Sequence, residues 1–332
     1  MKYLTRNCTL VLVLCALMSL PVTQSAAQAQ AGTAIDAPSA DNLMRHIYVL
    51  ADDSMMGRGT ETPEYDTAAR YVAEMFRKYA VVPDPRLGGS GLQRYYQYFG
   101  YESPGPLWEH GSLESHNVIG IVPGTDPELS SEQVVVGAHL DHMGVVDGQV
   151  MNGASDNAGG VAVMLEVARL ISRRPPSRTV VFVAFGAKEY GRLGSMVYVQ
   201  EIPDDVQIVA NINIDDVGHL GKGSGGRPLL GALHEKRICD DLFDMVRVHG
   251  DSAGIAITDR DRDDVFTDGD HYSFYQVDIP AIFFASTGEH EWRHTPQDDP
   301  EAMDGAQLQK VASVVYQTVR TVSENIDMCG SS

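Results

Sequence analysis

The stretch V-V-V-G-A-H-L-D-H-M-G (residues 134–144), followed by N-G-A-S-D-N-A-G-G-V-A (residues 152–162), decides the fold class of this chain. The first segment is an apolar run that ends at His139, and Asp141 comes two residues later. The second segment is a turn rich in glycine and asparagine, which carries Asp156 and opens an apolar helix pattern. A strand that ends in a histidine and a turn that places a carboxylate at a helix start are typical of metal sites at the edge of an α/β sheet.

The rest of the chain alternates between strand-like and helix-like segments. Strand-like apolar runs occupy residues 94–99, 118–122, 134–138, 179–185, 208–214 and 279–285. Helix-like segments cover residues 39–50, 62–79, 158–171, 236–249 and 307–326. This alternation predicts an α/β three-layer sandwich, in which a central, mostly parallel mixed β-sheet is flanked by helices. We expect a single domain over residues 36–328.

Five polar residues stand just past strand-like runs: His139, Asp156, Glu189, Asp215 and His294. The carboxyl ends of parallel strands meet along one edge of a sheet, so we expect these side chains to converge. Taken singly, each residue is weak evidence for a metal site, because an aspartate at a helix start, for example, is usually only a cap. As a set, two imidazoles and three carboxylates suit zinc, and they suit a pair of zinc ions better than one.

The chain has 332 residues and a formal net charge of −20 at pH 7. A chain this acidic does not bind phosphate backbones without a local basic patch. The sequence shows none, so we expect no nucleic-acid partner. One interpretation of the negative charge is a solvated acidic surface that favours solubility. A more specific interpretation is an acidic entrance to the site that attracts cationic substrates. Beyond the N-terminal leader, no segment is apolar enough to predict a membrane span.

Residues 1–31 have the pattern of a secretory signal peptide. Lys2 and Arg6 precede an apolar run at residues 10–20, and A-x-A motifs end at residues 29 and 31. We therefore expect a secreted or periplasmic protein. Cys239 and Cys329 would remain after cleavage, and export is compatible with either a disulfide between them or two free thiols.

Five motifs carry a family resemblance: A-H-L-D-H-M-G, G-A-S-D-N-A-G-G, K-E-Y-G-R-L-G-S, N-I-D-D-V-G and H-T-P-Q-D-D-P, in this order. In these motifs, and in upstream residues 51–60, the chain resembles the M28 family of zinc metallopeptidases. The resemblance runs from about residue 43 to residue 303. It implies the zinc-exopeptidase fold and a peptide substrate. The most similar activity is that of an aminopeptidase, which hydrolyses N-terminal peptide bonds with a metal-activated water. The short interval between Phe99 and His116 leaves no room for an inserted protease-associated domain.

The resemblance also implies roles for single residues. Asp156 would bridge two zinc ions per chain, with His139 and Asp215 completing one site and Glu189 and His294 the other. Asp141 would hold the ring of His139, as metal-bound histidines generally require. His271 would hydrogen-bond a substrate carbonyl or a tetrahedral oxygen, or would make only a polar loop contact.

Lys188 is the departure from the family pattern that bears on catalysis. Relatives carry Glu-Glu where this chain has Lys188-Glu189, and the first glutamate is their general base. Loss of a positioned base typically costs about 10²–10⁴-fold in rate, which favours a weak or inactive peptidase. Alternatively, zinc still acidifies water and another group moves the proton, with Lys188 as a neutral amine being one candidate. A third possibility is that Lys188 turns to solvent or pairs with a nearby acid such as Asp216.

Two other function classes stay open. One is a zinc-binding module that has lost catalysis. The other is a glutaminyl-cyclase-like acyltransferase on the same scaffold, which the resemblance associates with one zinc. The complete set of five ligand positions argues against this second alternative. Metal stoichiometry distinguishes it from the peptidase, with one zinc ion per chain against two.

Overall fold

The structure is a computed structural model that describes residues 37–102, 112–222, 226–234, 240–259, 267–287 and 291–324. The predictions for the leader at residues 1–31, for Cys239 and for Cys329 lie outside these ranges and stay predictions.

The central sheet is built from ten strands within the described residues. They are β1 (Val82–Pro83), β2 (Tyr96–Glu102), β3 (Ser112–Val122), β4 (Glu132–His139), β7 (Thr179–Phe185), β8 (Gln207–Ile214), β9 (Gly221–Lys222), β10 (Pro228–His234), β11 (Ala256–Asp259) and β12 (Ala281–Ser286). They lie in the order β1-β3-β7-β4-β8-β12-β10-β11, with β2 beside β3 and β9 beside β10. A short hairpin of β5 (Val145–Val146) and β6 (Gln149–Val150) stands apart from this sheet.

Parallel pairing is confined mainly to the centre of the sheet. β7, β4, β8 and β12 are mutually parallel neighbours. Antiparallel strands flank them, since β3 runs against β7 and β10 runs against β12. The predicted α/β sandwich around a mixed sheet is confirmed, although antiparallel pairs are more numerous than "mostly parallel" implies.

The sequence T-V-V-F-V-A-F explains why β7 lies in the interior. All of its residues are buried. Val180, Phe182 and Ala184 pack into the larger hydrophobic core, while alternate residues of the same strand face a second core on the other side. A strand with no polar side on either face is stable only when helices cover both faces.

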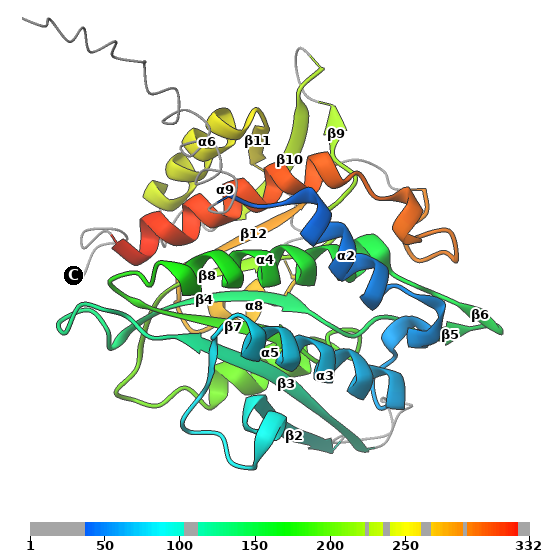
Figure 1. The fold of residues 1–332 in the computed structure, drawn as a ribbon, viewed down its shortest axis with the longest axis horizontal. Coiled ribbons are helices and arrows are strands. Elements are labelled where there is room, and N and C mark those ends of the chain that lie inside the picture. The colour runs from blue at the N-terminus through cyan, green and yellow to red at the C-terminus, as the bar shows by residue number, and fades with distance from the viewer. Residues whose placement is uncertain are drawn as a thin grey trace, which may run out of the picture. The chain divides into compact units, whose positions relative to one another are not determined.

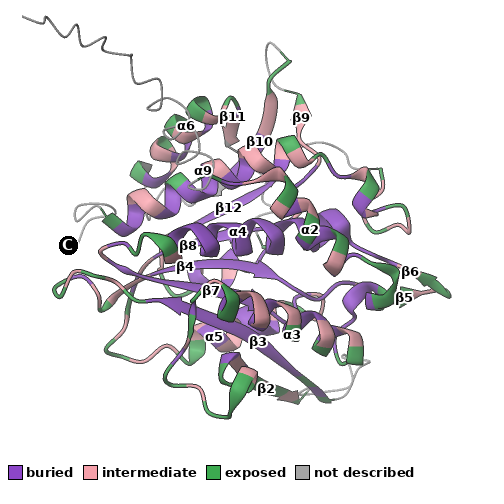
Figure 2. Cartoon of the chain, viewed as in Figure 1, coloured by how far each residue is buried: buried purple, intermediate pink, exposed green. Residues whose placement is uncertain are grey.

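Helices provide that cover on both faces of the sheet (Figure 1). One face packs against α3 (Pro63–Lys78), α4 (Gly159–Arg173) and α9 (Gly305–Glu324). On this side α2 (Ala40–Leu50) packs on α4 and α9, and α6 (Asp240–Ala253) lies beside α9. The other face carries α5 (Leu193–Gln200) and α8 (His271–Tyr275). Figure 2 shows that α4 is buried nearly all round, whereas α3 and α6 present exposed residues to the outside.

The helix starts follow local capping signals. The Ser39 side chain accepts a hydrogen bond from the Asn42 amide at the start of α2. The Thr62 hydroxyl accepts one from the Tyr65 amide at 3.1 Å, and Pro63 occupies the first turn of α3. Both arrangements satisfy amides that the first helical turn leaves without partners.

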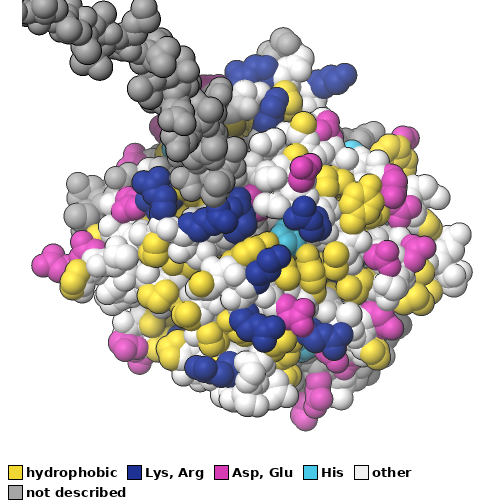
Figure 3. All heavy atoms as spheres, in the orientation of Figure 1, with side chains coloured by type: hydrophobic (Ala, Val, Ile, Leu, Met, Phe, Trp, Pro, Cys, Tyr) yellow, Lys and Arg dark blue, Asp and Glu magenta, His cyan; other side chains and the backbone are white. Residues whose placement is uncertain are grey.

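Charge on the helical face shown in Figure 3 is uneven: Lys and Arg side chains gather across its middle, and Asp and Glu lie mainly toward its rim. Arg45, Lys78 and Arg169 are close enough to His46 to help lower its pKa to about 4, after burial, which is the largest cause. An acidic chain thus carries a local basic patch that its linear sequence did not reveal. None of the helices in the described ranges has the length and apolarity needed to cross a membrane.

Candidate metal centre

Neighbouring parallel strands place the candidate site at one edge of the sheet. His139 is the last residue of β4, Glu189 follows β7, and Asp215 directly follows β8. Asp156 lies in η3 (Ala154–Ala158), the turn that leads into α4. His294 comes from the segment after β12. The edge where these strands end is where open α/β sheets form their sites.

The first ligand group consists of His139, Asp156 and Asp215, all buried. Nε2 of His139 lies 3.0 Å from Oδ1 of Asp215 and 3.1 Å from Oδ1 of Asp156. Burial lowers the pKa of His139, but Asp215 and Asp156 outweigh it, so the pKa lies well above its usual value. Three ligand atoms thus converge on one small volume between β4, β8 and the turn before α4.

The orientation of the His139 ring is set by Asp141, but not in the predicted way. Nδ1 of His139 donates to the backbone carbonyl of Asp141 at 2.9 Å, which leaves Nε2 free to bind a metal. The carboxylate of Asp141 instead accepts hydrogen bonds from the amides of Lys188 and Glu189, at 3.0 and 3.1 Å, and from Thr60 Oγ1 at 2.9 Å. The prediction that this carboxylate holds the ring is therefore wrong, because it fixes the Lys188-Glu189 turn.

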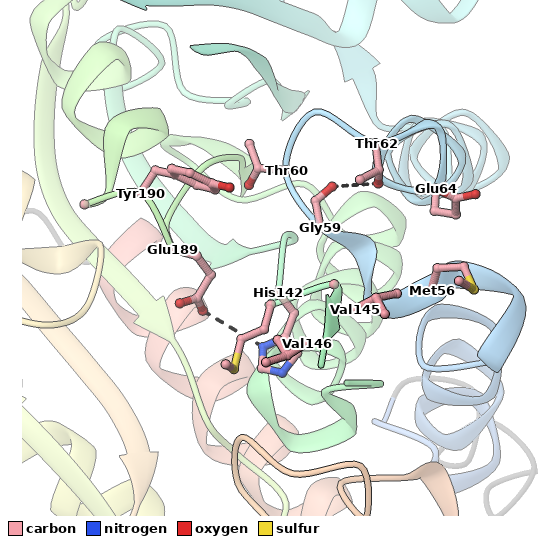
Figure 4. A pocket seen from close by; sticks show the side chains of 13 residues that line it. Met56, Gly59, Thr60, Thr62, Glu64, His142, Val145, Val146, Glu189 and Tyr190 are labelled. Atoms are coloured by element: carbon pink, nitrogen blue, oxygen red, sulfur yellow. Dashed lines mark hydrogen bonds and ion pairs between the residues drawn. The ribbon is translucent and has the colours of Figure 1, made fainter. Parts of the chain in front are cut away.

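A second group is formed by His142, Asp156 and Glu189. Nδ1 of His142 lies 4.0 Å from Oε1 of Glu189 (Figure 4). The sequence analysis did not single out His142 as a ligand, although it lies within residues 134–144, one residue after Asp141. His294, predicted for this site, places Nε2 2.8 Å from Oδ2 of Asp156, and its side chain is 40% exposed. All five predicted ligand positions therefore lie at the same edge.

The donor atoms fit the coordination of zinc. Two donors on one tetrahedral zinc lie roughly 3.4 Å apart, since Zn–N and Zn–O bonds are about 2.0–2.1 Å long. The contacts of 3.0–3.1 Å in the first group and 4.0 Å in the second lie on either side of this value. Asp156 belongs to both groups. Buried carboxylates gathered this closely require compensating cations.

Two cations of the chain also face these carboxylates. Nε of Arg293 lies 3.2 Å from Oδ2 of Asp156 and 3.7 Å from Oδ2 of Asp216. Nζ of Lys188 lies 3.5 Å from Oε1 of Glu189, and its side chain is only 6% exposed. Lys188 therefore does not turn to solvent. It pairs with a nearby acid, as one alternative expected, but that acid is Glu189 rather than Asp216.

The electrostatic setting of Lys188 is that of an ammonium ion in the metal-free protein. Burial lowers its pKa, but Asp215, Asp156 and Glu189 together outweigh burial and hold the pKa above its usual value. A neutral amine at this position therefore requires cations that offset these acids.

A buried arginine ties the loops of the site together. Arg58, at the end of η1 (Asp53–Arg58), is 1% exposed. Its guanidinium donates to the backbone carbonyls of Leu50, Leu140, Asn152 and Gly153 at 2.5–3.0 Å. Leu140 follows His139, and Asn152 and Gly153 precede Asp156. Arg58 therefore fixes both metal-site segments, residues 134–144 and residues 152–162. An arginine between two glycines in the sequence gave no signal of this role.

His271 lies at the start of α8, where it is 1% exposed and its ring stacks on Phe283 with centroids 4.4 Å apart. The pocket that adjoins the ligand groups is not lined by it. That pocket has a volume of about 920 Å³ and reaches His142 and Glu189 at one end (Figure 4). Its walls include apolar side chains from η1, from the β5 hairpin and from the turn after β7, namely Met56, Val145, Val146 and Tyr190.

The fold and these ligand groups define an α/β protein with a metal centre at the carboxyl edge of its sheet. The sequence model of peptidase family M28 matches residues 117–319, and the chain belongs to this family.

Among curated proteins, the chain is similar to aminopeptidase YwaD of Bacillus subtilis (strain 168), with 29% identity over an alignment of 223 residues that covers 62% of this chain and 45% of the relative. It is also similar to a probable glutamate carboxypeptidase of Arthroderma benhamiae, with 30% identity over 168 residues, 48% of this chain and 20% of that protein. The alignments thus span less than half the length of these curated relatives.

Solved structures share the fold. An aminopeptidase from Aneurinibacillus sp. strain AM-1 superposes with a TM-score of 0.68 at 18% identity, covering 86% of this chain and 94% of that one. The zinc aminopeptidase BSAP from Bacillus subtilis gives a TM-score of 0.65 at 19% identity, covering 87% and 96%. At these identities the likeness establishes the architecture of the sheet and helices.

Proposed function

We propose that this chain is a zinc-dependent exopeptidase, an aminopeptidase that carries two zinc ions and removes N-terminal residues from peptides. The observation that supports it most is the pair of ligand groups that share Asp156 beside an open pocket. Membership of peptidase family M28 and the names of the similar proteins point to the same chemistry. Two groups, rather than one, also favour this function over glutaminyl-cyclase-like chemistry.

Bound zinc supplies a Lewis acid and lowers the pKa of water towards about 7. The chain itself supplies positioning. Asp141 holds the backbone of the Lys188-Glu189 turn, and Arg58 holds the two loops that carry His139 and Asp156. The pocket beside Glu189 receives part of the substrate against its apolar wall.

Proton transfer is where this chain differs from its family. Lys188 stands at the position of the general base, and as an ammonium ion it can donate a proton to a leaving amine but cannot accept one from water. We therefore propose a slow peptidase, whose rate is limited by the missing carboxylate.

The activity is tested with purified, zinc-loaded protein and a panel of aminoacyl p-nitroanilides. We expect hydrolysis of substrates with a free α-amine, no hydrolysis of their N-acetyl counterparts, loss of activity with a chelator and recovery with zinc. A protein that holds two zinc ions and hydrolyses none of the free-amine substrates contradicts the proposal.

A second candidate, a zinc-binding protein without hydrolysis, is favoured by the buried Lys188 ammonium beside Glu189. Lys188→Glu restores a carboxylate, and Lys188→Met is its control, because it removes the charge without adding a base. A peptidase that appears only in Lys188→Glu identifies the wild type as a binding protein. Wild-type activity that rises about 10²–10⁴-fold in this variant identifies a slow peptidase. Strong wild-type activity that the variant does not improve shows that another group moves the proton.

We further propose that the protein is exported, on the basis of the leader pattern at residues 1–31. Expression of the full chain in a bacterial host, followed by N-terminal sequencing of the protein in the periplasm and medium, tests this. Mature protein that begins near residue 30 or 32 supports export, and an intact Met1 in the cytoplasm contradicts it.

A further inference from the structure

His142 carries a buried imidazole ring close to the first ligand group. It follows β4 in the loop that also carries Asp141, and it is 2% exposed. Within the described part of the chain, neither Nδ1 nor Nε2 has a hydrogen-bond partner. A buried polar group left without a partner destabilises the folded state, because it has given up its hydrogen bonds to water. Such groups are rare in native proteins, and a bound ion is one of their ordinary explanations.

The surroundings of His142 are those of a ligand rather than of a packed core residue. Its ring shares a ligand group with Asp156 and Glu189, whose donor atoms lie within 4.8 Å of one another. In Figure 4 the carboxylate of Glu189 points toward the ring. Gly153 makes room for the ring, because a Cβ at that residue would lie 2.5 Å from Cδ2 of His142.

We propose that His142 is a zinc ligand and binds the second ion together with Asp156 and Glu189. This assignment rests on the proposed two-zinc site and changes its composition. The family resemblance gives that ion one imidazole, from His294, whereas the geometry adds a second imidazole that is far less exposed. His294 is 40% exposed on its side chain and already contacts Oδ2 of Asp156.

The test measures zinc stoichiometry and affinity, by isothermal titration calorimetry and by metal analysis after dialysis at fixed free zinc. We expect two ions in the wild type. We expect one in His142→Gln at a free zinc concentration where the wild type holds both, with affinity for the second ion reduced more than about 10²-fold. Changes outside the ligand shell already cost 10–100-fold.

His116→Gln is the matched control. His116 is also buried, and its Nε2 also has no hydrogen-bond partner among the described residues. However, its ring packs between Tyr65 and Tyr96, with centroids 5.2 and 4.7 Å away, and belongs to neither ligand group. This variant is expected to keep both ions, so a loss confined to His142→Gln reports on ligation rather than on a vacated buried ring.

The outcomes separate this assignment from the proposed activity. If His142→Gln binds both ions as the wild type does, the assignment is refuted and the peptidase proposal is unaffected. If the wild type binds a single ion, both the two-zinc count and the assignment are refuted. If the variant loses one ion while the wild type hydrolyses no peptide substrate, the assignment stands and the activity fails.

A direct measurement covers the case in which the variant does not fold. Anomalous scattering at the zinc edge, from crystals of zinc-loaded wild type, locates both ions. A peak about 2.0–2.1 Å from a ring nitrogen of His142 supports the assignment. A second ion bound by Glu189 and His294 with His142 out of reach overturns it.

Discussion

Replacing Arg58 by methionine is expected to destabilise the metal-free protein by about 3 kcal/mol. Among the described residues, the carbonyls of Leu50, Leu140 and Asn152 accept hydrogen bonds from the guanidinium and from no other donor. The carbonyl of Gly153 also accepts one from the amide of Ala158. Three carbonyls therefore lose their partner inside a buried region. Each such loss costs at least about 1 kcal/mol.

The desolvation of the charge works in the opposite direction. Burial lowers the pKa of Arg58 to about 10, against the attraction of Asp298, Asp156 and Asp141, so the folded protein bears a cost that methionine removes. This is why we use the lower end of the range for each carbonyl. Arg58→Lys keeps the charge but offers fewer donors in a poorer geometry, and we expect it to be no more stable than Arg58→Met.

Urea unfolding followed by circular dichroism measures this loss, with a chelator present so that metal binding does not contribute. Arg45→Met is the control, since Arg45 is exposed and its one described hydrogen bond is to Asn42. The control is expected to change the free energy of unfolding by less than about 0.5 kcal/mol. A loss of less than about 1 kcal/mol in Arg58→Met, or one equal to that of Arg45→Met, would refute the reasoning.

Three further substitutions or titrations probe the site. Asp141→Asn is expected to lower the free energy of unfolding by about 2 kcal/mol, because an amide nitrogen then faces the donors of Lys188, Glu189 and Thr60. It is also expected to weaken zinc binding about 10–100-fold. Urea unfolding and zinc titration measure the two effects, and unchanged values in both contradict the role of the carboxylate. The raised pKa of His139 means that zinc must displace a proton at pH 7, so calorimetry in buffers of different ionisation enthalpy should show proton release that is absent in His139→Gln. In the metal-free protein the same shift stabilises the fold below about pH 6.5, and this contribution is lost as pH rises through the higher folded pKa. Gly153→Ala is expected to destabilise the protein more than Gly148→Ala: both glycines have positive φ, but only at Gly153 would a Cβ meet atoms, at 2.3 Å from the Asp156 carbonyl. Equal melting temperatures for the two alanine variants would show that the loop before Asp156 yields freely.

The parts of the fold that sequence predicted well are those with local signals. The prediction for residues 179–185 matches β7, because an unbroken apolar run has one stable location. The starts of α2 and α3 follow from Ser39 and Thr62, whose side chains act within one turn. By contrast, α5 and α8 were missed, since they are short and lack a distinct apolar stripe. β10 and β11 were missed as well, since they depend on partners far away in sequence.

The site shows the same division. Motifs placed the ligand positions at strand ends, and the structure brings them to one edge of the sheet. Spacing alone did not show that His142 turns inward beside Glu189, nor that the Asp141 carbonyl, rather than its carboxylate, meets His139. These contacts depend on backbone direction over single residues. The inward turn of Lys188 likewise depends on the field of the assembled carboxylates, which exists only after folding.

The place of β7 between β3 and β4 bears on how the protein is made. Ribosomes deliver β3 and β4 in succession, with only the residues between Val122 and Glu132 separating them. In the finished sheet they do not touch, because β7 lies between them and pairs with both. A nascent chain must therefore keep these two strands apart, or separate them again, until Phe185 has emerged. The interval during which residues 140–185 are translated is thus the period when the growing chain is most open to mispairing.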